Sequence, residues 1–384
     1  MTTYPDLTDD AARSHVETGV ANTPLNCLVI AHDDSPHLSQ IHTGFSVLAK
    51  SNVLNLHYEF GDYRWGGHFF SRRDPPLCGV YVVINQQVLI FYDLRDGAEM
   101  DARALEIADL YFKRSYSQAG TPLAYQHKVI PLGLNFEVYP DRPGLHDFKR
   151  LRTHRALSKS FFRSLAQLAS QWTGYPFLFV PELEKMRAAP QPDAPPRALF
   201  MVRAWDPEQD SNLSPAVKAD RRSINEMRAE CVRLLRRTYG ARFTGGFAHT
   251  EYAIRNFKDV LLENPEWAQK GKYLDLLQTH SVCISTAGLH GSVGWKFGEY
   301  VAFSKAIISE KLQFEPPEGF AQGSHYLEFS TPEGCIQATQ ALMSDPALRS
   351  RLMHNNHDYY RQYLKADRLV WRTLVMVKTH CGWT

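Results

Sequence analysis

The chain has 384 residues, which is more than one hydrophobic core usually organises, so we expect two domains. A hydrophobic content of 44% with 22% charged residues is typical of a folded protein, and a net charge of +2 gives no argument for a nucleic-acid partner. No window approaches the ~20 apolar residues of a membrane span, and residues 1–15 lack the pattern of a signal peptide. We therefore expect a cytoplasmic protein that associates at most peripherally with the inner face of a membrane.

The six cysteines are scattered without a C-x-x-C pair, and the 16 histidines form no H-x-x-x-H cluster. This pattern predicts reduced thiols and neither a metal site nor a cofactor. Basic residues cluster in Lys149 to Arg155 and in Arg233 to Arg237. Each cluster fits either an anionic membrane surface or a solvated helix face.

Strands and helices alternate in the first half of the chain. We expect strands over Cys27–Ala31, Gly79–Ile84, Val88–Tyr92 and Lys128–Leu132, and helices over Ala102–Tyr111 and Ala156–Gln171. A turn at Asn85-Gln86-Gln87 separates two of the strands. The glycine- and aromatic-rich segment Tyr58–Phe70 is expected to loop over the surface.

The clearest break in the chain is Ala188 to Arg197, which has four prolines and little apolar content. It predicts a linker or insertion at 186–197 between a domain at 1–185 and a domain at 198–384.

The second half shows the same alternation. We expect strands over Ala198–Arg203, Val282–Ile284 and Ala306–Ser309, a turn at Gly245-Gly246, and helices over Arg221–Tyr239, Trp295–Ala302, Thr331–Ser344 and Asp345–Val377. The predicted fold class is therefore α/β, with two Rossmann-like parallel-sheet domains facing a cleft and C-terminal helices packing back.

The stretch from Ser281 to Tyr300 reads as strand, small-residue loop and helix. Backbone N–H groups at such a helix start suit a phosphate or carboxylate, although the spacing matches neither common nucleotide fingerprint. The predicted ligand-binding residues here are Ser285, Thr286, Gly288, His290, Gly291, Ser292, Lys296 and Glu299. Lys296 would reach an anion and Glu299 a sugar hydroxyl. The alternative is a tight βα turn that needs glycine only for its shape.

The order of segments in the second half resembles the donor domain of GT-B glycosyltransferases. It consists of this loop, the Trp-Lys-x-x-Glu-Tyr helix, the strand Ala306–Ser309, the segment Gly319–Phe329 and the Thr-Pro-Glu helix. Ala108–Tyr116 and Lys128–Glu137 are similar to segments of bacterial enzymes that build surface polysaccharides, and within that group the retaining β-Kdo transferases are the most similar. The resemblance implies an acceptor-side first domain, a nucleotide-sugar second domain, and metal-independent transfer of Kdo from CMP-Kdo, with retention, onto a glycan such as O-antigen or capsule. The acceptor is either free or lipid-linked.

Two alternatives stay open. The donor is a UDP-, GDP- or dTDP-sugar, or the chain is a non-catalytic protein that binds a glycan or nucleotide. The chain lacks an Asp-x-Asp after a strand, which argues against a metal-clamped diphosphate.

Two carboxylates follow predicted strands at matching positions in the two halves. Asp206 follows Ala198–Arg203, and Glu137 follows Lys128–Leu132. Ligand-facing groups in parallel sheets lie beyond the carboxyl ends of strands, so we assign Asp206 as nucleophile and Glu137 as acid/base. The alternatives are a turn cap for Asp206 and an exposed loop position for Glu137.

Four further residues are candidates for substrate contacts. Arg203 would pair with the sugar carboxylate, His249 would line the site, and Lys113 and Arg114 would contact the acceptor or its phosphate. A structural histidine and a charged helix end are the alternatives. Asn225 and Arg228 are predicted to hold their helix to its neighbour, and Asp93 and Asp96 to shape a turn.

Overall fold

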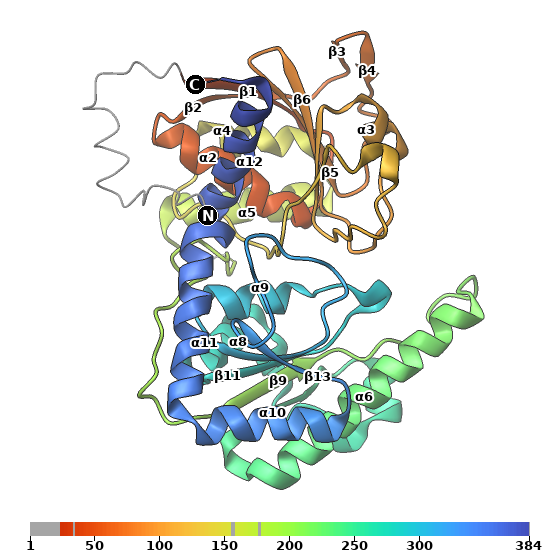
Figure 1. The fold of residues 1–384 in the computed structure, drawn as a ribbon, viewed down its shortest axis with the longest axis vertical. Helices are drawn as coiled ribbons and strands as arrows, with labels where there is room; N and C mark the ends of the chain where they lie inside the picture. Colours follow the sequence, from red (N-terminus) through yellow and green to blue (C-terminus); the bar gives the residue numbers. More distant parts are fainter. Residues whose placement is uncertain (1–23, 34, 155–157, 176–177, 384) are drawn as a thin grey trace.

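The computed structural model describes residues 24–33, 35–154, 158–175 and 178–383. Figure 1 shows two bodies, one above the other, each built around a central sheet. The upper body contains a six-stranded sheet and the lower body a five-stranded sheet. The predicted two-domain α/β architecture is therefore confirmed.

The six-stranded sheet has the order β2-β1-β5-β6-β7-β8. Its strands are β1 (Leu25–Ile30), β2 (Leu54–Glu59), β5 (Gly79–Ile84), β6 (Val88–Asp93), β7 (Leu110–Lys113) and β8 (Val129–Pro131). All pairs are parallel except those of β5, which runs antiparallel to β1 and to β6. The turn predicted at Asn85-Gln86-Gln87 is confirmed, since Ile84 pairs with Val88 across these three residues, and Asn85 (φ 51°) and Gln86 (φ 56°) are left-handed. It reverses the chain, so this sheet is mixed rather than wholly parallel.

Helices cover both faces of this sheet. Alternate side chains of the strands join one core with α2 (Ser39–Lys50) and α12 (Ala366–Cys381), and the other side chains join a core with α3 (Ala102–Ile107). The helix predicted over Ala102–Tyr111 was too long, because its last residues enter the buried strand β7. The predicted surface loop Tyr58–Phe70 contains the end of β2 and a hairpin of two short strands, β3 (Tyr63–Trp65) and β4 (His68–Phe70).

The five-stranded sheet is entirely parallel, in the order β10-β9-β11-β12-β13. Its strands are β9 (Ala198–Val202), β10 (Phe243–Phe247), β11 (Val282–Ser285), β12 (Ala306–Glu310) and β13 (Tyr326–Phe329). The turn predicted at Gly245-Gly246 was wrong, since both residues lie inside β10. A Cβ on Gly245 would come within 2.2 Å of the Phe200 carbonyl oxygen, so the neighbouring strand explains this glycine.

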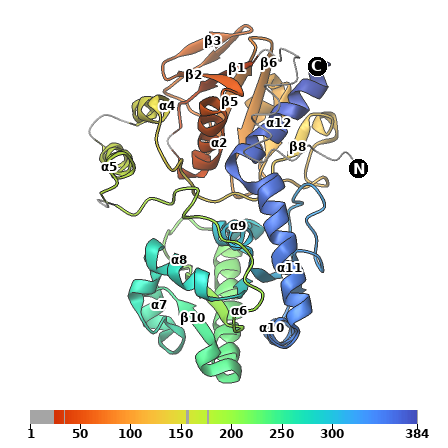
Figure 2. The ribbon, with the colours of Figure 1, turned by 90° about the vertical axis from the view of Figure 1, so that its left-hand side faces the viewer.

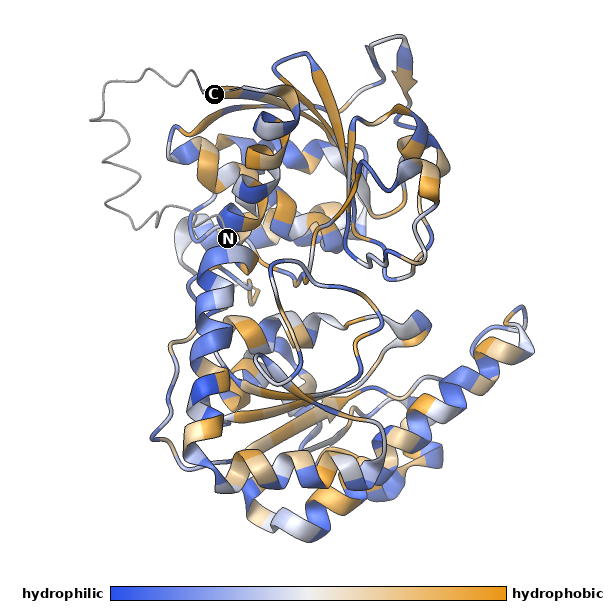
Figure 3. Ribbon diagram, viewed as in Figure 1, coloured by the Kyte–Doolittle hydropathy of each residue, from blue (hydrophilic) through white to orange (hydrophobic). Residues whose placement is uncertain are grey.

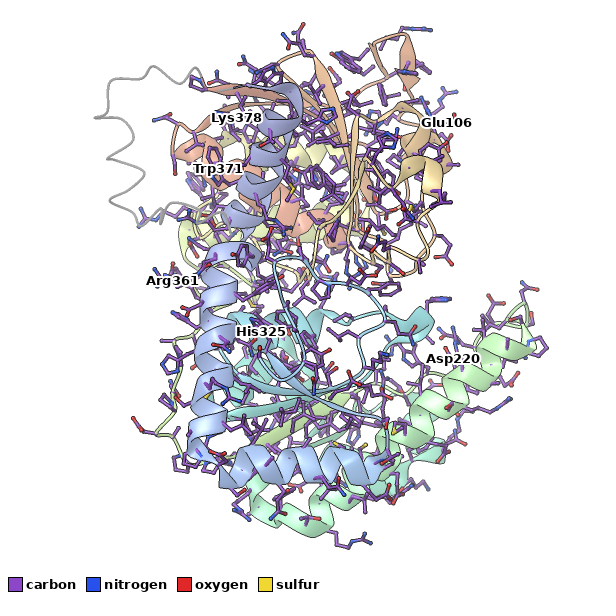
Figure 4. The ribbon with its side chains drawn as sticks, viewed as in Figure 1. Glu106, Asp220, His325, Arg361, Trp371 and Lys378 are labelled. Carbon is purple, nitrogen blue, oxygen red and sulfur yellow. The ribbon has the colours of Figure 1, made fainter. Side chains whose placement is uncertain are left out.

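One core of the lower body contains α8 (Lys270–Thr279) and α9 (Trp295–Ala302). The other contains α6 (Pro215–Tyr239), α7 (Glu251–Asn256), α10 (Pro332–Ser344) and residues of α11 (Pro346–Tyr359). Figure 3 shows the strands of both bodies as the more hydrophobic elements, and the long α6 as mostly hydrophilic. Helix α6 begins before the predicted Arg221, because Ser214 caps it and Pro215 occupies its first position. Its projecting end carries Asp220 (Figure 4).

The remaining elements are short or lie at the flank of the upper body. They are α4 (Leu145–Lys149), α5 (Lys159–Thr173), η1 (Pro36–Leu38), η2 (Leu123–Tyr125), η3 (Arg150–Thr153), η4 (Gly240–Arg242), η5 (Lys258–Val260), η6 (Pro265–Ala268), η7 (Leu289–Gly291) and the π-helical η8 (Tyr360–Leu364).

The chain crosses between the bodies twice. The first crossing leads into the predicted linker 186–197, which contains no helix or strand. The Ser304 hydroxyl holds this segment by donating a hydrogen bond to the Ala188 carbonyl at 2.7 Å. The second crossing is η8, where Figure 4 labels Arg361, and it leads to α12 in the upper body. The C-terminal helices therefore pack back as predicted, and residues 366–381 belong to the core of the first domain rather than to that of the second.

Among the described residues, no helix combines the length and the apolar character needed to cross a membrane.

Candidate functional site

The carboxyl ends of the parallel strands in the two sheets meet at the boundary between the bodies. After β7, the Tyr116 carbonyl accepts from the Glu315 N–H at 2.9 Å, and the Gln118 N–H donates to the Glu315 carboxylate at 3.0 Å. Arg114 Nη2 donates to the Val293 carbonyl at 2.6 Å. Open α/β sheets bind ligands beyond the carboxyl ends of their strands, and here two such edges face each other.

Two adjoining recesses lie at this boundary and share Val293. The first, of about 330 Å³ with its open mouth, is called the inter-domain recess; it is lined by Arg114, Ser115, Gly133, Leu134, Asn135, Val293, Gly294, Phe314 and Pro316. The second, of about 210 Å³, is called the glycine-loop recess; it is lined by Ser285, Thr286, Ala287, Gly291, Ser292, Val293, Ser309, Glu310, Lys311 and Leu312.

The glycine loop, residues 286–294, joins β11 to α9. His290 (φ 60°) and Gly291 (φ 66°) are both left-handed, and the Gly288 N–H donates to the Ser292 carbonyl at 2.9 Å, so the loop closes on itself. Gly294 is the N-cap of α9 and has no side chain to cap the first N–H groups. The positive end of α9 is therefore left for a ligand group.

A buried arginine supports the start of this loop. Arg228 of α6 donates to the Thr286 hydroxyl at 2.9 Å, to the Ala287 carbonyl at 3.0 Å and to the Arg203 carbonyl at 2.7 Å. Burial lowers the pKa of its guanidinium to about 10. Glu310 accepts from the Ala287 N–H at 2.7 Å, and burial raises the pKa of its carboxyl. The start of the glycine loop is thus held by the Arg228 guanidinium, which contacts Thr286 and Ala287, and by the Glu310 carboxyl, which contacts Ala287.

Several buried polar atoms at the boundary have no hydrogen-bond partner within the described chain. They are Asn135 Oδ1, His37 Nδ1 and Trp295 Nε1. The rings of His37 and Trp295 meet edge to face across the boundary with centroids 4.8 Å apart, and the Asn135 amide donates to the His37 carbonyl at 3.2 Å. Burial lowers the pKa of the His37 imidazole, which therefore stays neutral at neutral pH. An unsatisfied buried group costs about 1–3 kcal/mol, so this cluster points to a ligand or water.

The structure brings most of the predicted loop residues together. Ser285, Thr286, Gly291 and Ser292 line the glycine-loop recess. Gly288 packs against Ser292, since a Cβ there would come within 2.6 Å of the Ser292 hydroxyl oxygen. His290 is exposed and lines neither recess.

Lys296 and Glu299 lie apart from the recesses. Lys296 Nζ donates to the Met201 carbonyl at 2.5 Å and lies 5.2 Å from the centre of the Tyr273 ring. Burial lowers the pKa of this ammonium to about 8. The Glu299 carboxylate is buried in an ion pair with Lys270, and its Oε2 has no partner among the described residues. Neither side chain contacts the loop in the way the sequence predicted.

Asp206 lies beyond β9 as predicted, in a turn beside α6. Its Oδ1 accepts from the Glu208 N–H at 2.9 Å, which is the turn-capping role set out as the alternative. The exposed Arg203 guanidinium lies over the Trp205 ring, 5.7 Å from its centre. Neither side chain lines a recess. The predicted role of Asn225 is confirmed, because its amide exchanges hydrogen bonds with the Trp205 backbone at 2.8 and 2.7 Å.

Glu137 and His249 are also outside both recesses. Glu137 is half-buried and accepts from the Tyr139 hydroxyl at 3.1 Å. His249 Nε2 lies 2.8 Å from the Leu262 carbonyl oxygen, which fits the structural role described as its alternative. The structure therefore does not bring the two predicted catalytic carboxylates into one recess.

Lys113 is the last residue of the buried strand β7 and Arg114 follows it, so neither lies at a helix end. Lys113 is fully buried, with Nζ 3.2 Å from Asp93 Oδ1, and it cannot reach a substrate in this arrangement. Burial opposes ionisation of Asp93, but Arg95 and Lys113 outweigh it and lower the pKa of this carboxyl. Arg114 is paired with Asp96 and lines the inter-domain recess, so only the second of the two lies where a ligand would sit.

Sequence reasoning missed several residues at the site. Glu310 and Lys311 directly follow the strand that was predicted at Ala306–Ser309. The rule that ligand-facing groups lie beyond the carboxyl ends of strands, which we applied to Asp206, therefore pointed to these two residues equally. Asn135 lies two residues before Glu137, in a segment that the sequence already singled out. His37 carried no motif, and only the fold brings it to Trp295.

The fold is that of a two-domain α/β protein, and the paired strand ends place the candidate site at the boundary between the two bodies. No protein-family model and no curated protein sequence matches the chain. Three of the solved structures that resemble it are as follows. The C-terminal domain of a group 1 glycosyl transferase (LpcC) from Francisella tularensis shares 13% identity over 46% of this chain and 95% of that one, with a TM-score of 0.31. A putative UDP-N-acetylglucosamine 2-epimerase from Listeria monocytogenes shares 14% over 73% and 77%, with a TM-score of 0.33. The pneumococcal O-GlcNAc transferase GtfA, in complex with UDP and GlcNAc, shares 10% over 83% and 69%, with a TM-score of 0.36. At these TM-scores the likeness assigns no family to the chain.

Proposed function

We propose that the chain is a glycosyltransferase that binds a nucleotide sugar at the glycine-loop recess and transfers the sugar to a glycan held in the inter-domain recess. The observation that carries the proposal is the cluster of unpaired polar atoms of Asn135, His37 and Trp295, which lies where the two sheet edges meet. Neutral donors and acceptors in a partly apolar recess suit sugar hydroxyls. The uncapped start of α9, whose N-cap Gly294 lines the inter-domain recess beside the shared Val293, suits a phosphate where the two recesses adjoin.

CMP-Kdo is the donor we propose first. The described residues that line the two recesses include only two cations, Arg114 and Lys311, with Arg228 buried behind the loop. A nucleoside monophosphate ester carries less phosphate charge than a diphosphate and needs fewer cations. UDP-, GDP- and dTDP-sugars are the alternative donors, and the acceptor is a glycan that is either free or lipid-linked.

For the chemical step we propose retention through a covalent adduct. Asp206 attacks the anomeric carbon and expels the nucleotide, and the acceptor hydroxyl then displaces Asp206 while Glu137 moves the proton. Neither carboxylate lines a recess in this structure, so this mechanism requires the loop after β9 and the segment after β8 to move toward the donor.

The same observation favours a second candidate, a non-catalytic protein that binds a glycan or nucleotide. One experiment separates the two. The melting temperature is measured with CMP, UDP and GDP, and release of CMP from CMP-Kdo is then followed with an acceptor glycan. A ligand at 100 times its Kd adds about 2.7 kcal/mol of stability. A shift without turnover of any sugar nucleotide supports the binding protein, and no shift with any nucleotide contradicts the glycosyltransferase and any nucleotide-binding role.

A further inference from the structure

Helix α5 carries three of its large apolar side chains on a face that points to solvent. Phe162, Leu165 and Trp172 are 53%, 40% and 76% exposed. With Ala169 they follow the spacing i, i+3, i+7 and i+10, which places them on one face of the helix. We call these four residues the α5 stripe.

The opposite face of α5 is mostly polar and is turned inward, and Leu168 is the one buried apolar residue among the described residues of this helix. Gln167 and Ser170 are buried, Ser164 Oγ lies 3.0 Å from His154 Nε2, and the Ser170 hydroxyl accepts from the Leu178 N–H at 3.1 Å. A surface helix of a folded protein normally buries its apolar stripe. The reversed orientation indicates that the stripe is covered by something other than the described part of this chain.

The charges around the stripe indicate what covers it. Between residues 142 and 179 the sequence contains seven Lys or Arg residues and one acidic residue, a net charge of +6 in a chain whose total is +2. The single acid, Asp147, is buried and accepts from the Ser46 hydroxyl and the Gly144 N–H. The exposed basic residues are Arg142, Lys149, Arg152, Lys159 and Arg163. The surface is therefore apolar and cationic at once.

One further exposed apolar side chain lies beside this surface. Leu145 of α4 is 68% exposed and precedes the basic Lys149 and Arg152. Figure 2 shows α4 and α5 together at the outer flank of the upper body, to the left of its sheet. Both elements thus present apolar and basic side chains on the same flank.

We infer that the α5 stripe and its basic neighbours dock the protein on an anionic lipid surface. Aromatic and leucine side chains would enter the headgroup boundary while lysine and arginine contact the phosphates, as interfacial amphipathic helices do. A neutral protein partner would bury the stripe but would gain nothing from the surrounding positive charge. The inference does not depend on the proposed function.

The test is flotation of the full chain with phosphatidylcholine vesicles, with and without phosphatidylglycerol. The wild type is expected to float only with the anionic vesicles, and to do so less at high salt. Phe162→Ser and Trp172→Ser should each reduce partition about tenfold, because each removes one aromatic side chain from the lipid boundary. Leu123→Ser is the matched control, since Leu123 is 86% exposed in η2 outside this flank and its loss should leave flotation unchanged.

Each other outcome counts against the inference. Equal flotation of the wild type and of both α5 variants would mean that another surface contacts the lipid. Absence of wild-type flotation would mean that the protein does not dock on anionic lipid at all. Sedimentation without vesicles tests whether a second copy of the chain covers the α5 stripe instead. A wild-type dimer that becomes a monomer in Trp172→Ser would show that it does. Nucleotide-dependent melting should be the same in all variants, so a failed docking surface is distinguishable from a failed donor site.

Discussion

Gly298 of α9 lies directly against the backbone of Asn135, across the boundary between the two bodies. A Cβ on Gly298 would come within 2.9 Å of the Asn135 carbonyl oxygen and within 3.2 Å of the Phe136 ring. The helix that follows the glycine loop is therefore packed on the segment that carries one of the unpaired polar atoms. The position of α9 relative to the first domain depends on the absence of a side chain here.

Gly298→Ala should weaken this contact. Because the nearest atom is a backbone oxygen, the bodies must shift apart or the helix must move, at a cost of about 1–3 kcal/mol. We expect a lower melting temperature and a changed small-angle scattering profile. Gly294→Ala is the control, since a Cβ there meets no atom within 4 Å. Identical melting curves for the two variants would contradict the contact.

Ser292→Ala should weaken nucleotide binding without unfolding the protein. Its hydroxyl lies in the glycine-loop recess, and loss of a hydrogen bond to a charged phosphate costs about 1.5–3 kcal/mol. Nucleotide titration measures the effect, and Ser344→Ala on α10 is the control. Lys296 and Glu299 line neither recess, so Lys296→Ala and Glu299→Ala should lower stability first and weaken binding only by displacing α9. An unchanged titration for Ser292→Ala would exclude this recess as the donor site.

Arg228→Lys should disorder the entrance of the glycine loop. An ammonium cannot replace the forked guanidinium that contacts Thr286, Ala287 and Arg203 at once. We expect a loss of about 1–3 kcal/mol in unfolding free energy, together with weaker nucleotide binding. Arg222→Lys on the same helix is the control, because Arg222 is exposed and forms a surface ion pair with Glu208 at 2.8 Å. Equal denaturation midpoints for the two variants would argue against the role of Arg228.

Asp206→Asn should preserve nucleotide binding and abolish most turnover, because an amide is a poor nucleophile. Incubation with donor alone, followed by intact-protein mass spectrometry and peptide mapping, should show a sugar ester on Asp206 in the wild type only. Asp210→Asn is the matched control, since Asp210 caps a turn of the same kind in the same loop, at 2.9 Å from the Asn212 N–H. An adduct on another carboxylate reassigns the nucleophile, and normal turnover of Asp206→Asn ends the case for this residue.

Stability should fall as the pH is lowered below neutral. Burial lowers the pKa of His280 from 6.5 to about 4, and its ring nitrogens lie 2.6 Å from the Leu276 carbonyl and 2.9 Å from the Thr244 hydroxyl. Between these values the unfolded chain binds the extra proton, so up to about 3 kcal/mol is lost as the pH falls from about 6.5 to about 4. Chemical denaturation across this range should show a smaller pH slope for His280→Gln, whereas the exposed His354→Gln should keep the wild-type slope.

Much of the fold could be predicted because it follows from local patterns. The fully buried run Val88–Asp93 is a strand by composition alone, and the proline-rich stretch before β9 marks the linker. The strand Leu110–Lys113 was missed because helical spacing continued into it, and the burial of Lys113 depends on Asp93 in a neighbouring strand. The glycine loop was predicted from its small residues. The contacts of His37 with Trp295 and of Asn135 with Gly298 join segments more than 150 residues apart, and no local pattern encodes them.

The second crossing of the chain restricts how the two bodies move. One connection runs through the linker 186–197 and the other through η8, so two covalent attachment points define an axis about which the bodies can rotate. Helix α12 is packed against α2 so closely that a Cβ on Gly44 would come within 2.2 Å of the Ala366 carbonyl oxygen. Proteolytic cleavage within 186–197 would therefore leave the two fragments associated through α12, and a first domain expressed without residues 366–381 would lack part of its own core.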